Sequence, residues 1–237
     1  MTIKVLVVDD SALIRQILSE IIKSEPDMIL VGAAPDAFVA KKLVLEKAPD
    51  VITLDIEMPK VDGLRFLEVL MNAKPTPVVM ISTLTEKGAD ATLRSLELGA
   101  IDFVAKPKIG VAQGMADYHE MIVEKIRTAA RSKVKKRNPT KSAAVKTVSY
   151  SGTEKVIAIG ASTGGTEAIK EVLSTFPANA PATVITQHMP AGYTSTFAKR
   201  LDAVCQMQVK EAKGGERLLP GQAYLAPGDK HMEIERS

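Results

Sequence analysis

Short apolar runs rich in valine and isoleucine alternate with amphipathic stretches along most of this chain, and this alternation constrains the fold more than any other feature. In the first half the runs lie at Ile3–Val8, Met28–Gly32, Val51–Leu54, Val78–Ser82 and Ile101–Ala105. The intervening stretches repeat apolar residues at helical spacing, as Ile14, Leu18 and Ile21 do. Continuous apolar strands that alternate with helices are typical of a parallel sheet covered on both faces. We therefore predict a five-fold βα domain over residues 1–127.

A basic, polar segment follows, which we expect to be a linker over residues 128–153. Between Arg131 and Thr153 it holds seven lysines or arginines and no acid, although the net charge of the whole chain is only +3. A segment of this composition buries too little apolar surface to order itself. Because the basic charge is confined to this segment, it does not indicate a nucleic-acid-binding face.

A second α/β pattern begins after the linker, over residues 154–237. We expect helices at Thr166–Thr175 and Thr194–Leu201. The expected strands are Val156–Gly160, Thr183–Gln187, Met207–Lys210, Ala223–Ala226 and Met232–Ile234. This pattern predicts a second doubly wound parallel α/β domain, incomplete at its C-terminus.

Cysteine content and hydropathy favour a cytoplasmic protein. The single cysteine, Cys205, excludes an internal disulfide framework, and we interpret it as a structural residue rather than a nucleophile. The N-terminus lacks the long apolar stretch of a signal peptide. No run approaches the roughly 18 apolar residues of a membrane span, so we expect no membrane insertion.

Carboxylates at predicted strand ends indicate a phosphoryl-acceptor site in the first domain. Asp9 and Asp10 end the first strand and Asp55 ends the third. Such ends converge on one edge of a doubly wound sheet, where three carboxylates need a cation, and oxygen ligands suit Mg²⁺. Ser82 and Lys106 end the fourth and fifth strands and add a hydroxyl and an ammonium. A lone aspartate could be a helix cap, but five suitable side chains are poorly explained as caps.

Four motifs make this half resemble the two-component receiver domains over its first 120 or so residues. They are Val7-Val8-Asp9-Asp10-Ser11, Leu54-Asp55-Ile56-Glu57-Met58-Pro59, Met80-Ile81-Ser82 and Ala105-Lys106-Pro107. The resemblance implies a flavodoxin-like fold and a histidine kinase that phosphorylates Asp55. It also implies that Asp9, Asp10 and Asp55 hold Mg²⁺, that Ser82, Lys106 and Phe103 act as the switch, and that the Lys106–Pro107 bond is cis.

A glycine-rich loop and a histidine mark a candidate hydrolytic site in the second domain. Gly160-Ala161-Ser162-Thr163-Gly164-Gly165 follows a predicted strand and opens a helix, which places Ser162 on a nucleophile elbow. The loop lacks the lysine of a phosphate-binding P-loop. The glycines could also serve only close packing of the helix against the strand. His188 ends the next strand and could act as general base if the two strands are neighbours. We assign His119 to helix packing and His231 to a rim or structural role.

Three stretches make the second half resemble the methylesterase domain of chemotaxis response regulators. They are Ile159–Gly165, Gln187–Pro190 and Leu219–Gly228. With the receiver pattern in front, the chain is similar to the CheB family, protein-glutamate methylesterase/protein-glutamine glutaminase. That resemblance implies methyl-ester hydrolysis and glutamine deamidation on chemoreceptors, with Ser162 and His188 as catalytic residues and no cofactor for the esterase.

The resemblance also implies a regulatory mechanism and a missing group. The unphosphorylated receiver would cover the Ser162 edge, and phosphorylation of Asp55 would uncover it. The family's triad aspartate lies downstream of the last residue here, so we expect a truncated chain with impaired esterase activity. Two alternatives stay open, a DNA-binding response regulator, for which no helix-turn-helix is evident, and a stand-alone phosphate-accepting module.

Overall fold

The computed structural model describes residues 2–83, 85–106, 112–134 and 155–235. Its contacts divide the chain into two units, Met1–Asn138 and Pro139–Ser237. Most of the predicted linker and the predicted cis bond between Lys106 and Pro107 lie outside the described residues. No helix within the described ranges combines the length and apolarity needed to cross a membrane.

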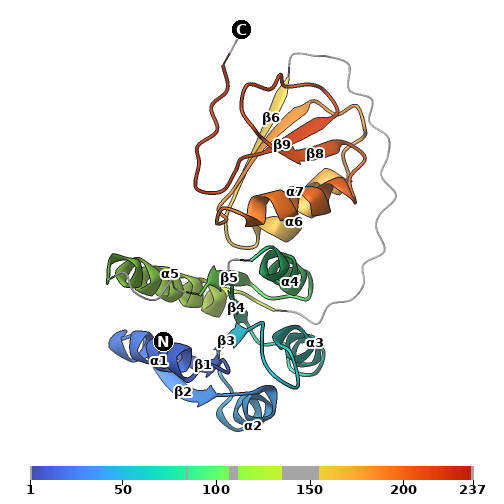
Figure 1. Ribbon diagram of the computed structural model, residues 1–237. Helices are drawn as coiled ribbons and strands as arrows, with labels where there is room; N and C mark the ends of the chain where they lie inside the picture. The colour runs from blue at the N-terminus through green and yellow to red at the C-terminus, as the bar shows by residue number, and fades with distance from the viewer. Residues whose placement is uncertain (1, 84, 107–111, 135–154, 236–237) are drawn as a thin grey trace. The chain divides into compact units, whose positions relative to one another are not determined.

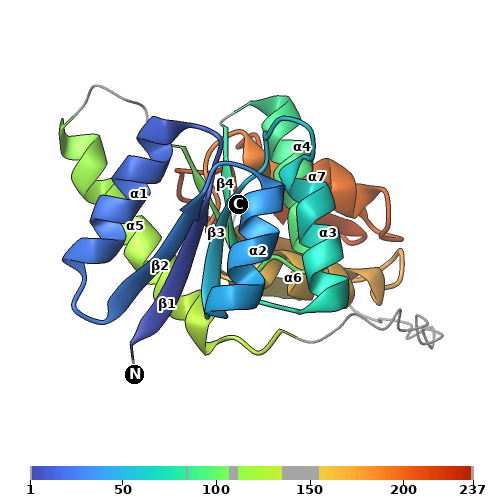
Figure 2. The same cartoon turned by 90° about the horizontal axis from the view of Figure 1, so that it is seen from below.

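The first unit is a five-stranded parallel sheet in the order β2-β1-β3-β4-β5 (Figure 1). Its strands are β1 (Ile3–Val8), β2 (Met28–Ala34), β3 (Val51–Asp55), β4 (Val78–Ser82) and β5 (Asp102–Ala105). Its helices are α1 (Ala12–Ser24), α2 (Ala37–Lys47), α3 (Gly63–Ala73), α4 (Glu86–Glu97) and α5 (Ala112–Arg131). Helices α1 and α5 cover one face, and α2, α3 and α4 cover the other (Figure 2). The predicted five-fold βα domain is confirmed.

Burial explains why these segments form this sheet. Every residue of β3 and β4 is buried, as expected for strands covered on both faces. Apolar residues of α1 and α5, such as Leu18 and Ile122, pack in one core cluster with residues of β1 and β4. Helix α5 continues to Arg131 because Ile126 and Ala129 are fully buried, so the boundary predicted at residue 127 falls within this helix.

The second unit is a four-stranded parallel sheet in the order β6-β7-β9-β8. Its strands are β6 (Val156–Ala161), β7 (Ala182–Gln187), β8 (Gln208–Glu211) and β9 (Gln222–Leu225). Helices α6 (Gly165–Ser174) and α7 (Tyr193–Asp202) contact each other on one side of this sheet (Figure 1). The prediction of a second parallel α/β unit is therefore confirmed.

One predicted strand is wrong. Met232–Ile234 is not in a strand and pairs with no strand among the described residues. Ile234 is 55% exposed, so its apolar side chain lies on the surface. A strand forms only when a neighbouring strand supplies partners for its backbone hydrogen bonds. A short run of alternating apolar residues does not show whether such a neighbour exists.

Candidate functional site

An acidic pocket lies at the carboxyl edge of the first sheet. Asp9 follows β1, Asp55 is the last residue of β3, and both are buried, whereas Asp10 is exposed. Each of these three aspartates offers a carboxylate oxygen, and those oxygens lie within 4.8 Å of one another. Lys106, which follows β5, places its Nζ 2.8 Å from Asp55 Oδ2 and 3.3 Å from Asp9 Oδ2. The structure thus brings together four of the residues predicted to form the phosphoryl-acceptor site.

Burial dominates the electrostatics of this pocket. It raises the pKa of Asp55 from its ordinary value to about 6, and the neighbouring charge of Asp9 adds to the shift, while the hydrogen bond from Lys106 opposes it. Burial also raises the pKa of Asp9, again against the charge of Lys106. The pKa of Lys106 is raised, because its bonds to the two carboxylates outweigh its own burial. One ammonium therefore offsets two buried carboxylates only in part.

Backbone and side-chain contacts fix the two buried carboxylates. Asp9 Oδ1 accepts a hydrogen bond from the backbone N–H of Ser11 at 2.8 Å, and Asp55 Oδ1 accepts one from Glu57 at 3.2 Å. Arg15 Nη1 donates to the carbonyl oxygens of Asp9 and Asp10, at 2.8 Å each. The sequence motifs did not identify Arg15, because its guanidinium donates to main-chain carbonyl groups and not to a side chain.

The donor set of the pocket fits a hard divalent cation. Asp9 Oδ2 is buried and makes no hydrogen bond to any described residue, and its contact with Lys106 is an ion pair at 3.3 Å. A buried carboxylate oxygen in this state is costly unless a cation approaches it. Asp10 is exposed, so solvent reaches this edge of the sheet. Carboxylate oxygens with room for water are the ligands that Mg²⁺ prefers.

The predicted switch residues lie on the two strands beside the pocket. Ser82 ends β4 and is buried, and its Oγ lies 2.6 Å from Thr92 Oγ1 on α4. Phe103 on β5 is also buried and pairs in register with Met80 of β4. Thr92 was not predicted, since a buried threonine inside a helix carries no distinctive signal. A turn of Ser82 toward Asp55 requires its separation from Thr92.

In the second unit, Ser162 and His188 follow neighbouring strands at the same edge. Strands β6 and β7 are parallel and hydrogen-bonded, and their last residues, Ala161 and Gln187, are partners in register. The backbone N–H of His188 donates to the carbonyl of Ala161 at 3.0 Å, so the pairing extends to the histidine itself. The condition on which the Ser–His hypothesis depended, adjacency of the two strands, is met.

The two side chains are exposed and are not bonded to each other. No hydrogen bond joins Ser162 Oγ to the His188 ring, and within the described part of the chain no carboxylate contacts that ring. Asp202 Oδ1 accepts from Val209 N at 2.8 Å, which closes the α7–β8 turn. Asp229 Oδ2 accepts a long bond, 3.4 Å, from Ala191 N.

The loop after β6 has the backbone of a sharp strand–turn–helix elbow. Gly164 has φ 75°, the left-handed region that favours glycine, and it caps α6 without a side-chain hydrogen bond. The N–H of Gly165 donates to Ser162 O at 2.8 Å and closes the turn. The first turn of α6 therefore presents backbone N–H groups beside Ser162 with no side-chain cap.

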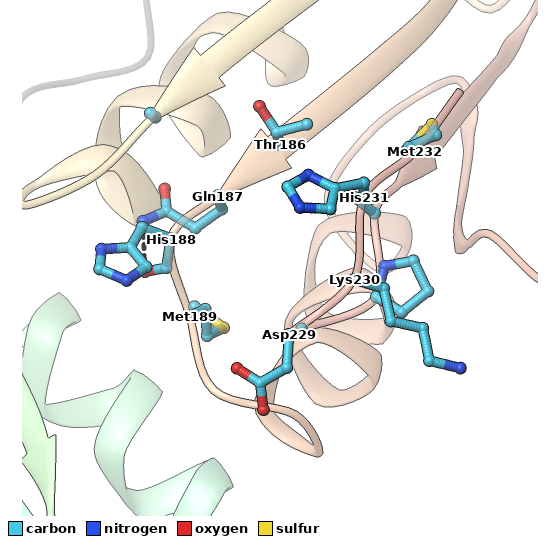
Figure 3. A pocket seen from close by; sticks show the side chains of 12 residues that line it. Thr186, Gln187, His188, Met189, Asp229, Lys230, His231 and Met232 are labelled. Carbon is cyan, nitrogen blue, oxygen red and sulfur yellow. Dashed lines mark hydrogen bonds between the residues drawn. The ribbon is translucent and has the colours of Figure 1, made fainter. Parts of the chain in front are cut away.

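A pocket of about 630 Å³ opens beside His188. Gln187 and His188 line one side, and the loop of Asp229, Lys230 and His231 lines the other (Figure 3). The loop approaches closely because Gly228 has no side chain, since a Cβ there would lie 2.5 Å from Ala191 N. His231 is exposed and lines the pocket as His188 does. Cys205 lies outside this lining, and burial raises the pKa of its thiol to about 11.

Comparisons with known proteins agree with this two-part organisation. A family model described as response regulator receiver domain matches residues 5–112, and one described as CheB methylesterase matches residues 157–237. The protein-glutamate methylesterase/protein-glutamine glutaminase 2 of Pseudomonas aeruginosa is 58% identical over 242 residues, which are 100% of this chain and 68% of that protein. The protein-glutamate methylesterase/protein-glutamine glutaminase of Salmonella choleraesuis is 59% identical over 236 residues, 99% of this chain and 68% of that protein.

A solved structure extends the likeness to three dimensions for the first unit. The response regulator domain of Thermotoga maritima CheB is 44% identical, with a TM-score of 0.51, and the match covers 56% of this chain and 99% of that domain. This chain spans about two thirds of the length of the curated relatives it matches.

Proposed function

Because the chain belongs to the CheB family of protein-glutamate methylesterase/protein-glutamine glutaminases, we propose that it hydrolyses glutamate methyl esters on chemoreceptors in the cytoplasm. The same site would deamidate particular receptor glutamines. Both reactions are attacks on a side-chain acyl carbon, so one nucleophile serves both. The observation that carries the proposal is the placement of Ser162 and His188 after paired, parallel strands.

In the proposed reaction, Ser162 and His188 divide the chemistry of acyl transfer. Ser162 Oγ attacks the acyl carbon while His188 takes the hydroxyl proton. His188 then returns that proton to the leaving group, which departs as methanol from an ester or as ammonia from an amide. Water, deprotonated by His188, attacks the acyl carbon, and His188 returns the proton to Ser162 Oγ as glutamate is released. Uncapped N–H groups at the start of α6 would stabilise the negative charge that develops on the acyl oxygen.

In the first unit, we assign the phosphoryl acceptor to Asp55, with a histidine kinase as the phosphodonor. Asp9, Asp10 and Asp55 would hold Mg²⁺, which supplies the positive charge that lets a phosphate approach a carboxylate. Lys106 already binds Asp55 and would pair with the phosphoryl oxygens. Ser82 would turn from Thr92 toward the new group, and Phe103 would follow. Phosphorylation would thereby raise the rate of ester hydrolysis in the second unit across the linker proposed for residues 128–153.

The hydrolytic proposal is tested by methanol release from methyl-esterified chemoreceptors. Ser162→Ala and His188→Ala are expected to lower kcat by at least about 1000-fold, since the nucleophile or its base is lost. Ser195→Ala, a neutral change on α7, is expected to keep activity within about 2-fold. Methanol release by Ser162→Ala at the wild-type rate would contradict the proposal.

The acceptor proposal is tested separately with radiolabelled acetyl phosphate. The protein is expected to take up an acid-stable but base-labile label that needs Mg²⁺ and is lost in Asp55→Asn. Asp117→Asn, on the exposed surface of α5, is the matched control and should label normally. Labelling without any methanol release would favour a stand-alone phosphate-accepting module.

A further inference from the structure

One side chain contacts the main chain of both proposed catalytic residues. The Gln187 Nε2 group donates to Ser162 O at 2.9 Å and to His188 O at 3.3 Å. Gln187 is the last residue of β7, so its side chain reaches across from its own strand to the loop that follows β6. A carboxamide NH₂ carries two N–H bonds and can serve both carbonyls at once.

We propose that Gln187 is a positioning residue for hydrolysis, whose carboxamide holds the Ser162 loop against the His188 loop. This inference rests on the proposed function of Ser162 and His188. Gln187 acts through the main chain of these residues and is not itself assigned any contact with the reacting atoms.

Main-chain hydrogen bonds also hold the two loops. The His188 N–H is bonded to Ala161 O, and the Gly165 N–H to Ser162 O, so the first bond joins the strands and the second lies within the elbow. Beyond Ala161, the bond from Gln187 to Ser162 O is a side-chain hydrogen bond that joins the two loops directly.

The orientation of the carboxamide follows from its surroundings. If its oxygen and nitrogen exchanged places, the oxygen would face two carbonyl oxygens and both hydrogen bonds would be lost. With the nitrogen on the carbonyls, Oε1 points toward Gly165 and is buried without a hydrogen bond. Ser162 O also accepts from the Gly165 N–H, so the carboxamide adds a second hydrogen bond to this carbonyl and supplies one to His188 O.

Gly165 leaves the space that the carboxamide occupies. A Cβ at this position would collide with Gln187 Oε1 and would lie 2.6 Å from the Cβ of Ala161. Gly165 has no positive φ, so the glycine is required here by space and not by backbone conformation. The second glycine of the pair and Gln187 thus form one packing unit beneath Ser162.

The kinetic consequence follows from what the residue touches. Displacement of a catalytic group by about 1 Å can cost about 100-fold in rate. Since the Gln187 carboxamide is directed at main-chain carbonyls, its loss should lower kcat about 10- to 100-fold and leave KM within about 2-fold. Labelling of Ser162 by a fluorophosphonate, which needs the same serine and histidine but no receptor, should slow by a similar factor.

The test uses two substitutions of similar length in the whole protein. Gln187→Met removes the donors and keeps the bulk. Gln187→Glu replaces the NH₂ with a carboxylate oxygen that repels both carbonyls near neutral pH and regains one donor when protonated. The ratio of its rate to that of wild type is therefore expected to rise as the pH falls from about 8 to 5. Gln206→Met, the same change at an exposed site, should be neutral.

Gly165→Ala provides an independent arm. It should displace the carboxamide and, because the same Cβ also meets Ala161, lower kcat at least as much as Gln187→Met does, and the double variant should be no slower than Gly165→Ala alone. Additive losses would overturn the proposal, as would kcat of Gln187→Met within 2-fold of wild type. If Gln187→Met fails to fold by circular dichroism, the pH dependence of Gln187→Glu decides, and a flat ratio would refute the positioning role. Retained activity in Ser162→Ala would instead refute the proposed function.

Discussion

At the scale of residues, the acidic pocket is a problem of unbalanced charge. Asp9 and Asp55 are almost completely buried, and Lys106 is the cation that touches both. The raised pKa values of the two carboxyls show that the protein alone does not compensate the charges it has buried. A bound cation would complete the balance, which is the physical reason for proposing metal binding and phosphate acceptance at the same residues.

The pH dependence of stability follows from the raised pKa of Asp55. With a folded-state pKa of about 6, against the ordinary 3.8, the folded chain binds this proton more tightly than the unfolded chain. Stability is therefore lost as the pH rises from about 4 to 6, and the full cost, up to about 3 kcal/mol, is present above pH 6. Asp55→Asn should stabilise the metal-free first unit at pH 7.5, and about half as much at pH 5.

Hydrogen exchange of amides in β1 and β3, measured in EDTA, would give the free energy of opening at each pH. Addition of Mg²⁺ should stabilise wild type more than Asp55→Asn, because the ion binds the carboxylate that the variant lacks. An equal effect of Asp55→Asn at both pH values would show that the carboxyl does not titrate in this range.

At the scale of elements, the strand ends made both sites predictable. Ser162 and His188 could be paired from sequence because each follows a strand of one βαβ unit, and Asp9 and Asp55 because parallel strands end at one edge. Arg15 and Gln187 could not be found this way, since a side chain that bonds to carbonyl groups leaves no pattern in the chain. The strand predicted at Met232–Ile234 does not form, because a strand needs a neighbouring strand for its backbone hydrogen bonds.

Helix α7, strand β8 and the loop that borders the pocket meet at one buried hydroxyl. Thr194 Oγ1 donates to Glu211 Oε1 at 2.5 Å and accepts from the N–H of Gly228 at 3.1 Å. Thr194→Val keeps the shape but leaves an N–H and a carboxylate oxygen without this partner, which should destabilise the second unit by roughly 2 kcal/mol. Thr194→Ser keeps the hydroxyl and should lose less.

Urea denaturation, followed by hydrogen exchange in β8, β9 and the loop at residues 226–230, would measure this effect. Ser195→Ala, on the next residue of α7, serves as the control and should change stability by no more than about 0.5 kcal/mol. A loss confined to α6, far from the hydroxyl in the sequence, would contradict this assignment of Thr194.

At the scale of the whole molecule, each unit carries one site at the carboxyl edge of its own parallel sheet. The first site is proposed to gain and lose a phosphoryl group, and the second is proposed to hydrolyse esters. A chemical change in one unit alters the rate in the other only if two states of the molecule differ in both sites. Ser82 and Phe103, the proposed switch residues, are the groups in the first unit through which such a difference would pass.

Phosphorylation should therefore raise ester hydrolysis through Ser82, by about 5- to 150-fold if the coupling free energy is in the usual range of about 1–3 kcal/mol. In Asp55→Asn the activation by acetyl phosphate should vanish while basal hydrolysis stays. Ser82→Ala should still accept the label at Asp55, but its activation should fall several-fold, because the hydroxyl that leaves Thr92 for the phosphoryl group is gone. Methanol release, measured with and without acetyl phosphate, gives the ratio for each variant. If Ser82→Ala were activated as fully as wild type, the coupling would not pass through the Ser82 hydroxyl. If Asp55→Asn were still activated by acetyl phosphate, phosphorylation of Asp55 would not be the cause of the activation.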